Sequence, residues 1–456
     1  MMHFSRKMIG GGLLCAAVLA QQSAFAQAAD LLTIYQQAEL SDPVYRQAIA
    51  NSHAVAEGIP QARAQLLLPT VSMSGSISRN RQDNEFSGFG GAAGITSFTA
   101  KSYSVNLTQP LFHFERIFAL KQADKRLQQA EYELSAAQQD LILRVAQRYF
   151  DVLAAEDSLE FANAEYSALQ RQLEQAQQRF EVGLIAITDV QEAQAGADRA
   201  IASQILAQNV LDNAREALRE LTLAYHTDLL KLGENLPLAA PQPNDINSWT
   251  ELALTQNLAL SGARLAADIA QQDIRVQYAG HLPGLDLVGR HGYSKSGGRF
   301  GDSQSISGEV GLQVSVPIYE GGRVVSRTNQ ARYRHTQALE QLEQQQRSVH
   351  RQTRQAFLGI QARISSVQAL RQAVVSARTA VESTEAGFEV GTRTAVDVVT
   401  AERNLYQSLR DYARARYDYV LDIFNLKQAA GTLAEEDLIM ANTWLTESDE
   451  PLATSR

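Results

Sequence analysis

Two long tracts of this chain contain no proline. The 10 prolines leave 126 residues free between Pro110 and Pro237, and 133 residues free between Pro317 and Pro451. Because proline removes a helix hydrogen bond and clashes with the preceding turn, very long helices require such tracts. In the first tract, leucine recurs every seven residues, at Leu120, Leu127, Leu134 and Leu141. Heptads of this kind predict long helices that pack side by side at shallow angles.

Each tract also contains one copy of a repeated motif. The motif reads RFEVGLIAITDV at residues 179–190 and GFEVGTRTAVDV at residues 387–398, 208 positions later. Glycine permits a tight chain reversal, and a carboxylate near the start of a helix is favoured by the helix dipole. The motif therefore predicts two helical hairpins, with Asp189 and Asp397 near the starts of the returning helices. Two ordinary capped hairpins would give the same spacing without any special function.

A pair of alternating segments precedes each tract. Residues 70–78 (TVSMSGSIS) and 102–108 (SYSVNLT) alternate apolar with small polar side chains, and residues 284–290 and 308–317 do the same in the second half. Such alternation predicts strands with one apolar face. That face packs on a core in an ordinary antiparallel sheet, whereas it contacts lipid in an outer-membrane barrel.

Several features favour the lipid-facing alternative. Gly/Ser-rich loops join the strands of each pair, and no segment of the mature chain is apolar enough for a transmembrane helix. Phe112, Phe114 and Tyr319 lie near strand ends, where a barrel carries its aromatic girdle. Four strands cannot close a barrel, since about eight are the minimum. The barrel must therefore be shared between copies of the chain: two copies would supply eight strands and three would supply twelve, and the long helices, which need room for a tunnel, favour the larger number.

The first 28 residues have the pattern of an export signal. Arg6 and Lys7 precede an apolar stretch, and small residues allow cleavage after Ala26 or Ala28. The chain's one cysteine, Cys15, lies inside that stretch, so the mature protein would have none. A cysteine-free chain suits an oxidising compartment.

The charge and the histidines exclude two functional classes. A formal net charge of −9 without a basic cluster argues against nucleic-acid binding. The eight histidines are scattered, with no metal-ligand or nucleophile spacing, so we expect neither an enzyme nor a cofactor or metal site.

Together these patterns predict a membrane α+β protein with a tandem internal repeat. The expected segments are a signal peptide (1–28), periplasmic helices (29–66), a first barrel hairpin (67–110), tunnel helices with a turn at 180–190 (111–235), a linker and periplasmic helix (236–281), a second barrel hairpin (282–318), tunnel helices with a turn at 388–398 (319–431) and a polar C-terminal tail (432–456).

The chain resembles the TolC family of outer-membrane export ducts over nearly its whole mature length. The matching stretches are RFEVGLIAITDV, HLPGLDL, VSVPIYEGGR, GFEVGTRTAVDV and NLKQAAGTLAEEDL. The resemblance implies a homotrimer whose 12-stranded barrel lies in outer-membrane lipid and continues into a periplasmic α-helical tunnel. It also implies a tunnel tip that opens on docking with a periplasmic adaptor and an inner-membrane ABC or proton-driven transporter.

The resemblance assigns roles to the repeated motif. Thr188, Asp189 and Arg393 match the tip-closing network, and Asp397 matches an acidic ring at the constriction. The residues that match the adaptor-docking turns are Gly183, Leu184, Gly391 and Thr392.

Two positions depart from the family pattern. Phe388 stands where a tyrosine would bond to Asp189, and Thr400 stands where a second acidic ring would lie. We therefore expect a tip held more by Arg393, which has only Ile185 as its counterpart in the first copy and could pair with an aspartate of the neighbouring repeat. Without a second acidic ring, the sequence does not predict inhibition of the channel by multivalent cations.

Two other functional classes fit part of the pattern. A structural coiled-coil or fibre protein would be soluble without detergent, and a plain diffusion porin would not need proline-free tracts of this length. The cargo, whether protein, peptide or drug, leaves no mark in the sequence.

Overall fold

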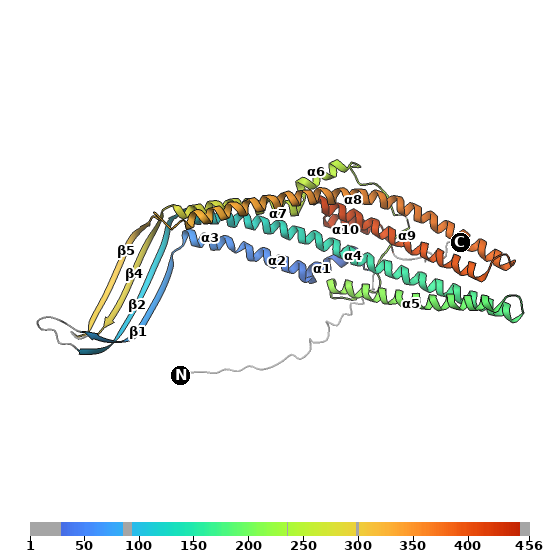
Figure 1. The fold of residues 1–456 in the computed structure, drawn as a ribbon, viewed down its shortest axis with the longest axis horizontal. Helices are drawn as coiled ribbons and strands as arrows, with labels where there is room; N and C mark the ends of the chain where they lie inside the picture. The colour runs from blue at the N-terminus through green and yellow to red at the C-terminus, as the bar shows by residue number, and fades with distance from the viewer. Residues whose placement is uncertain (1–28, 85–93, 235, 298–300, 447–456) are drawn as a thin grey trace, which may run out of the picture.

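The computed structural model describes residues 29–84, 94–234, 236–297 and 301–446. The chain forms a long molecule with a β-sheet at one end and two helical hairpin turns at the other (Figure 1). The expected signal peptide lies outside the described residues. Among the helices of the described ranges, none has an apolar stretch long enough to cross a bilayer.

Four long helices form the body of the molecule. They are α4 (Phe114–Glu181), α5 (Ile187–Thr222), α8 (Arg323–Glu389) and α9 (Ala395–Ala430). The two halves match closely, because α4 and α8 have 68 and 67 residues while α5 and α9 have 36 each. At about 1.5 Å per residue, α4 extends over roughly 100 Å without a break. The prediction of long helices in the proline-free tracts is confirmed.

The heptad pattern identifies the packed face of α5. Its buried apolar side chains recur at steps of three, four or seven residues, at Val190, Ala193, Ala197, Ala200, Ala207, Leu211 and Leu218. Alanine at four of these seven positions allows α4 and α5 to approach closely along the hairpin. The spacing of residue types in the sequence therefore determines which face of α5 is buried.

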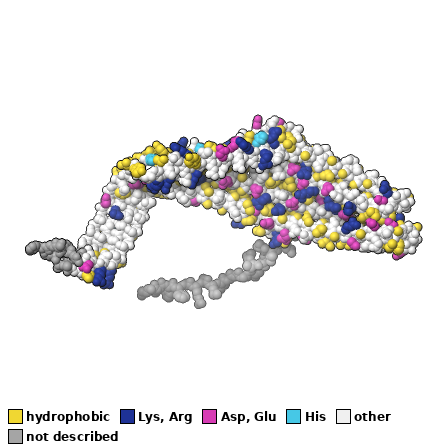
Figure 2. Space-filling model, in the orientation of Figure 1, with side chains coloured by type: hydrophobic (Ala, Val, Ile, Leu, Met, Phe, Trp, Pro, Cys, Tyr) yellow, Lys and Arg dark blue, Asp and Glu magenta, His cyan; other side chains and the backbone are white. Residues whose placement is uncertain are grey.

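The sheet contains β1 (Thr70–Asn84), β2 (Gly94–His113), β4 (Gly284–Ser296) and β5 (Ser303–Ser315), antiparallel and in the order β1-β2-β4-β5. The alternation is confirmed, since Val71, Met73 and Ile77 are exposed on one face and serines line the other. The visible face of the sheet is mostly free of charged and hydrophobic side chains (Figure 2). β1 and β5 are both edge strands within one chain.

The first hairpin extends further than its sequence suggests. β2 continues past Pro110 to His113, with a register shift between Pro110 and Phe112. A bulge accommodates the proline, which has no N–H for the ladder. His113 Nε2 lies 2.9 Å from Asp286 Oδ1 on β4 and joins the two hairpins where the strands meet the helices.

Shorter helices flank the long ones. They are α1 (Leu31–Ser41), α2 (Pro43–Ala56), α3 (Gly58–Leu67), α6 (Ile246–Gln256), α7 (Leu258–Tyr278) and the 3₁₀ turn η1 (Ala279–His281). We expected one helix in residues 236–281, but Asn257 divides the segment into α6 and α7. Its side chain accepts a hydrogen bond from Leu260 N at 2.9 Å and caps α7.

The expectation of a polar C-terminal tail at 432–456 is wrong for its first half. α10 (Glu435–Asn442) and β6 (Leu445–Thr446) pack into the main core, and β6 pairs with β3 (Lys231–Leu232). Leu433, Leu438 and Ala441 are buried. Leu438 and Ala441 are three residues apart, so they lie on one face of α10, and this face is buried although the helix begins with three acidic residues.

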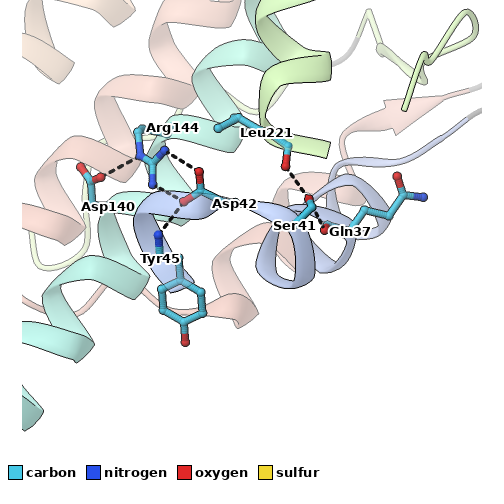
Figure 3. Close-up of polar contacts among 7 residues, drawn as sticks. All are labelled: Gln37, Ser41, Asp42, Tyr45, Asp140, Arg144 and Leu221. Atoms are coloured by element: carbon cyan, nitrogen blue, oxygen red, sulfur yellow. Dashed lines mark hydrogen bonds and ion pairs between the residues drawn. The ribbon is translucent and has the colours of Figure 1, made fainter. Parts of the chain in front are cut away.

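A buried carboxylate joins α1, α2 and α4 in the middle of the molecule (Figure 3). Asp42 is 1% exposed, accepts a hydrogen bond from Tyr45 N at 2.8 Å and caps α2. Arg144 of α4 donates to both of its oxygens, at 3.3 and 2.8 Å. The same guanidinium also pairs with Asp140 at 2.8 Å. Next to Asp42, the Ser41 hydroxyl donates to Leu221 O at the end of α5.

Candidate functional site

The two repeated turns lie together at the end of the molecule opposite the sheet (Figure 1). One turn connects α4 to α5 and the other connects α8 to α9. The predicted site residues therefore come from two segments about 200 positions apart, and the fold brings these segments to one end.

The first turn closes with a left-handed glycine. Gly183 has φ of +76° and donates to Phe180 O at 2.9 Å, while Leu184 N donates to Arg179 O at 2.9 Å. Residues with a Cβ are disfavoured at this φ, so glycine is needed here. Asp189 then accepts a hydrogen bond from Ala186 N at 3.2 Å. Its carboxylate is thus occupied within its own turn and does not reach the second hairpin.

The second turn repeats this geometry with an additional cap. Gly391 has φ of +74°, and Thr392 donates through both its N–H and its hydroxyl to Gly387 O, at 2.8 and 3.0 Å. Asp397 accepts from Thr394 N at 2.9 Å and from the Thr394 hydroxyl at 3.0 Å. The first turn lacks this hydroxyl, because Ala186 stands in place of Thr394.

These hydrogen bonds hold the pKa of Asp397 below its ordinary value of 3.8. The backbone N–H of Thr394 contributes most, followed by the hydroxyl of Thr394, and the positive charge of Arg393 adds to the effect. A lowered pKa means that the cap stabilises the turn above pH 3.8 and is lost as the pH falls through the lower value. At neutral pH the carboxylate is therefore ionised and the cap is complete.

The difference between the caps gives a matched pair of substitutions. We expect Thr394→Ala to destabilise the start of α9 by about 1 kcal/mol, and Ala186→Thr to stabilise the start of α5 by up to about 1 kcal/mol. Hydrogen exchange of the amides in the first turn of each helix measures both changes. Unchanged exchange in α9 of the Thr394→Ala protein would contradict the assigned cap.

Arg393 does not make the contact that we expected of it. Among the residues that the structure describes, no carboxylate lies within 4.0 Å of its guanidinium, so no ion pair links it to the first repeat. Its side chain instead lies over Gly387, where an added Cβ would be 2.7 Å from Arg393 Cγ. Gly387 leaves room for Arg393 at the end of the same hairpin.

A different arginine links the two hairpins. Arg179, at the end of α4, has its guanidinium 4.6 Å from the centre of the Phe388 ring, and its Nη1 donates to Phe388 O at 3.3 Å. Phe388 is buried against Ala395 and Val398. The aromatic ring that cannot bond to Asp189 therefore receives a cation from the other repeat. The sequence contains one indication that Arg179 is special: the first copy of the motif has an arginine at this position, whereas the second copy has Gly387.

The hairpins also approach each other just behind the turns. An added Cβ at Gly196 of α5 would lie 3.0 Å from Val399 Cγ1 of α9. This spacing is tighter than ordinary van der Waals contact, so a larger side chain would press the helices apart. Gly196 and the Arg179–Phe388 contact together hold the two turns of one chain side by side.

The outer surface of the turns is apolar. Val182, Leu184 and Val390 are 70%, 72% and 75% exposed. Thr188 and Thr392 are also exposed, so both remain accessible to another molecule. The fold gathers the predicted site residues at one end, but the only described link between the hairpins at the turns themselves is made by Arg179 and Phe388.

Comparisons with known proteins agree with this architecture. The model of the family described as "Outer membrane efflux protein" matches residues 34–222 and 249–432. The outer membrane protein TolC of Escherichia coli is 41% identical over 95% of this chain and 88% of its own length. The alkaline protease secretion protein AprF of Pseudomonas aeruginosa is 30% identical over 92% of this chain and 88% of its own.

Solved structures share the fold. The Campylobacter jejuni CmeC outer membrane channel superposes with a TM-score of 0.73 at 17% identity, covering 91% of this chain and 90% of that one. VceC of Vibrio cholerae gives a TM-score of 0.72 at 19% identity, covering 88% and 96%. The strand order, the long helices and the full-length relatives lead to one conclusion: the chain belongs to the outer membrane efflux protein family, whose members are transport channels of the outer membrane.

Proposed function

We propose that three copies of this chain assemble into one exit duct, with the sheets forming a 12-stranded barrel and the long helices forming a tunnel into the periplasm. The observation that supports this most strongly is the sheet itself. It exposes an apolar face and leaves the outer edges of β1 and β5 without a partner strand. Unpaired backbone groups in hydrocarbon cost several kcal/mol each, so the edges must pair with other strands.

The duct works in a three-part export system with a periplasmic adaptor and an inner-membrane transporter, either an ABC or a proton-driven one. The names of the relatives support protein secretion as one use, since AprF and PrtF are protease secretion proteins. The match to the outer membrane efflux protein family, and the similarity to the efflux protein BepC of Brucella suis, favour a duct that also serves efflux.

The turns have two roles in this proposal. Gly183, Leu184, Gly391 and Thr392 form the surface that docks with the adaptor, and the exposed Leu184 is its apolar centre. Thr188, Asp189, Phe388, Arg393 and Asp397 belong to the network that closes the tip. Asp397 of three copies would form one ring of carboxylates at the constriction, while Thr400 adds no charge to a second ring.

Cysteine cross-linking tests the docking role. Because Cys15 lies in the expected signal peptide, a cysteine introduced at Leu184 or Thr392 is the single thiol of the exported protein. We expect either variant to cross-link to the adaptor in cells that contain the whole system. A cysteine at Tyr333, which is exposed on α8 near the sheet, is the matched control and should not cross-link. Cross-links from Tyr333 but from neither turn would place the adaptor elsewhere.

A further inference from the structure

The end of the sheet farthest from the helices carries a basic cluster (Figure 2). Arg79 and Arg81 lie near the end of β1, Lys101 lies on β2 and Lys295 lies on β4. Each of these four side chains is exposed. Neither the export function nor the tip contacts make use of them.

Strand register places all four on the apolar face. Arg79 and Arg81 follow Met73 and Ile77 at even spacing along β1, whose pairing with β2 is continuous. Side chains two residues apart on a strand share a face. Lys101 pairs with Ile77 on one side and with Lys295 on the other, so both lysines belong to this face as well. In an outer-membrane barrel the apolar face contacts lipid, so the basic side chains point to the bilayer and not to the lumen.

An aromatic pair marks the depth of the cluster. Tyr103 and Tyr293 are register partners one step below Lys101 and Lys295, with ring centres 5.3 Å apart and planes at 17°. Tyrosine is enriched at membrane interfaces, where its amphipathic ring lies at the level of the headgroups. The basic side chains lie directly beyond these rings and hence at the level of the headgroups of the outer leaflet.

The arrangement of like charges favours binding of an anion. Lys101 and Lys295 are directly opposite each other, and cross-strand pairs of like charge are destabilising. Lys295 has Asp302 at 3.2 Å. Among the described residues, no carboxylate pairs with Lys101, Arg79 or Arg81, and Arg79 is the diagonal neighbour of Lys101. Asp83 shares the face but lies beyond Arg81 at the strand end, so the cluster keeps a net positive charge.

Within the described strands, the opposite face of the sheet carries no such basic cluster. At the same level it carries Ser76, Ser78 and Asn80 on β1, Ser102 on β2 and Ser294 on β4. A solubility requirement alone would distribute charge over the water-filled lumen as well. At this level the charges are confined to the side where an outer-leaflet lipid is available, whereas the charged residues of the opposite face, such as Arg290 and Glu309, lie nearer the helices.

We propose that Arg79, Arg81, Lys101 and Lys295 form a binding site for the phosphate groups of the phosphorylated glycolipid of the outer leaflet. Arg79, Lys101 and Lys295 bind one phosphate between β1, β2 and β4, and Arg81 extends the site towards the strand end. Guanidinium and ammonium groups make charge-assisted hydrogen bonds to phosphate. The Tyr103–Tyr293 pair contacts the first carbons of the acyl chains.

Native mass spectrometry of the full-length exported protein in neutral detergent tests the site, with bisphosphorylated lipid A as the probe. The variant carries Arg79→Gln, Lys101→Gln and Lys295→Gln. We expect it to bind this lipid on the order of a hundredfold more weakly than the parent, because each basic residue near an anionic lipid contributes roughly fivefold. The matched control carries Arg327→Gln, Arg334→Gln and Arg371→Gln, which remove three exposed charges from α8 and should leave binding unchanged.

Two arms use the unaltered protein and do not depend on the folding of a variant. Fully dephosphorylated lipid A should bind far more weakly than the bisphosphorylated form, and a large excess of inorganic phosphate should displace little of the latter. Equal binding of both lipids, or equal binding by parent and variant, overturns the proposal. Complete displacement by inorganic phosphate also overturns it, since the site would then recognise a free anion.

Discussion

Replacement of Arg179 by alanine is expected to open the tip of the duct. The substitution removes the ring contact and the hydrogen bond that link α4 to Phe388, which are the direct link between the two turns. A cation–π contact at a half-exposed site contributes about 1 kcal/mol. In the proposed trimer three copies act together, so the closed state loses about 3 kcal/mol and the ratio of open to closed tips rises on the order of a hundredfold.

Single-channel conductance in planar bilayers measures this change. The Arg179→Ala protein should show larger steps, or much longer open periods, than the parent. Arg179→Lys is the matched control, because lysine keeps the charge but lacks the planar guanidinium, and we expect an intermediate result. Arg393→Ala should have a smaller effect, since the described contacts of Arg393 lie within its own hairpin. Identical conductance in the parent and Arg179→Ala proteins would show that this contact does not close the tip.

Replacement of Asp42 by alanine is expected to cause the largest loss of stability. It removes the cap of α2 and leaves Arg144, in a largely buried position, with one exposed partner. Losing the cap costs about 1 kcal/mol, and breaking a buried pair costs more, so we expect a total of about 3 kcal/mol. The matched control is Asp140→Ala. It removes the other partner of the same arginine, but Asp140 is 52% exposed, so the loss should stay below about 1 kcal/mol.

Intrinsic fluorescence reports this loss conveniently. The chain has two tryptophans, Trp249 and Trp444, and both pack in the core that α1 and α4 share. The midpoint of urea unfolding should fall much further in the Asp42→Ala protein than in the Asp140→Ala protein. Equal shifts of the unfolding midpoint in the two proteins would mean that the buried Asp42–Arg144 pair stabilises the fold no more than the exposed Asp140–Arg144 pair.

The same network gives a pH dependence. Burial alone would raise the pKa of Asp42, but the hydrogen bond from Arg144, with help from Tyr45 N, outweighs burial and lowers it below 3.8. The contribution of Asp42 is therefore present above pH 3.8 and disappears as the pH falls through the lowered pKa. The stability difference between parent and Asp42→Ala should narrow in that acidic window.

The long elements of this fold could be predicted because their signals are local and repeated. Absence of proline over more than a hundred residues leaves few alternatives to α4 and α8, and the leucine heptad adds to this prediction for α4. Strict alternation in β1 likewise identifies the exposed face. By contrast, the sequence around Pro110 indicates the end of a strand, yet β2 continues through a bulge to His113. Whether a strand ends at a proline or continues through a β-bulge depends on its pairing with the neighbouring strand, and the local sequence does not give that pairing.

The candidate site was predictable in position but not in its contacts. Repetition identified the turns and their glycines. The Arg179–Phe388 contact joins residues 209 positions apart, so it depends on how one hairpin lies against the other. α10 was missed for a related reason, because the segment is short and Leu438 and Ala441 are buried only by packing against the core to which α1 and α4 also contribute. Long-range packing decides both cases.

The open edges of β1 and β5 have a consequence for biogenesis. A single chain placed in a bilayer would leave two rows of backbone groups without hydrogen-bond partners. A membrane-inserted monomer is therefore unstable. Insertion and association must then occur as one event, and the yield of duct should rise more steeply than in proportion to the supply of exported chains.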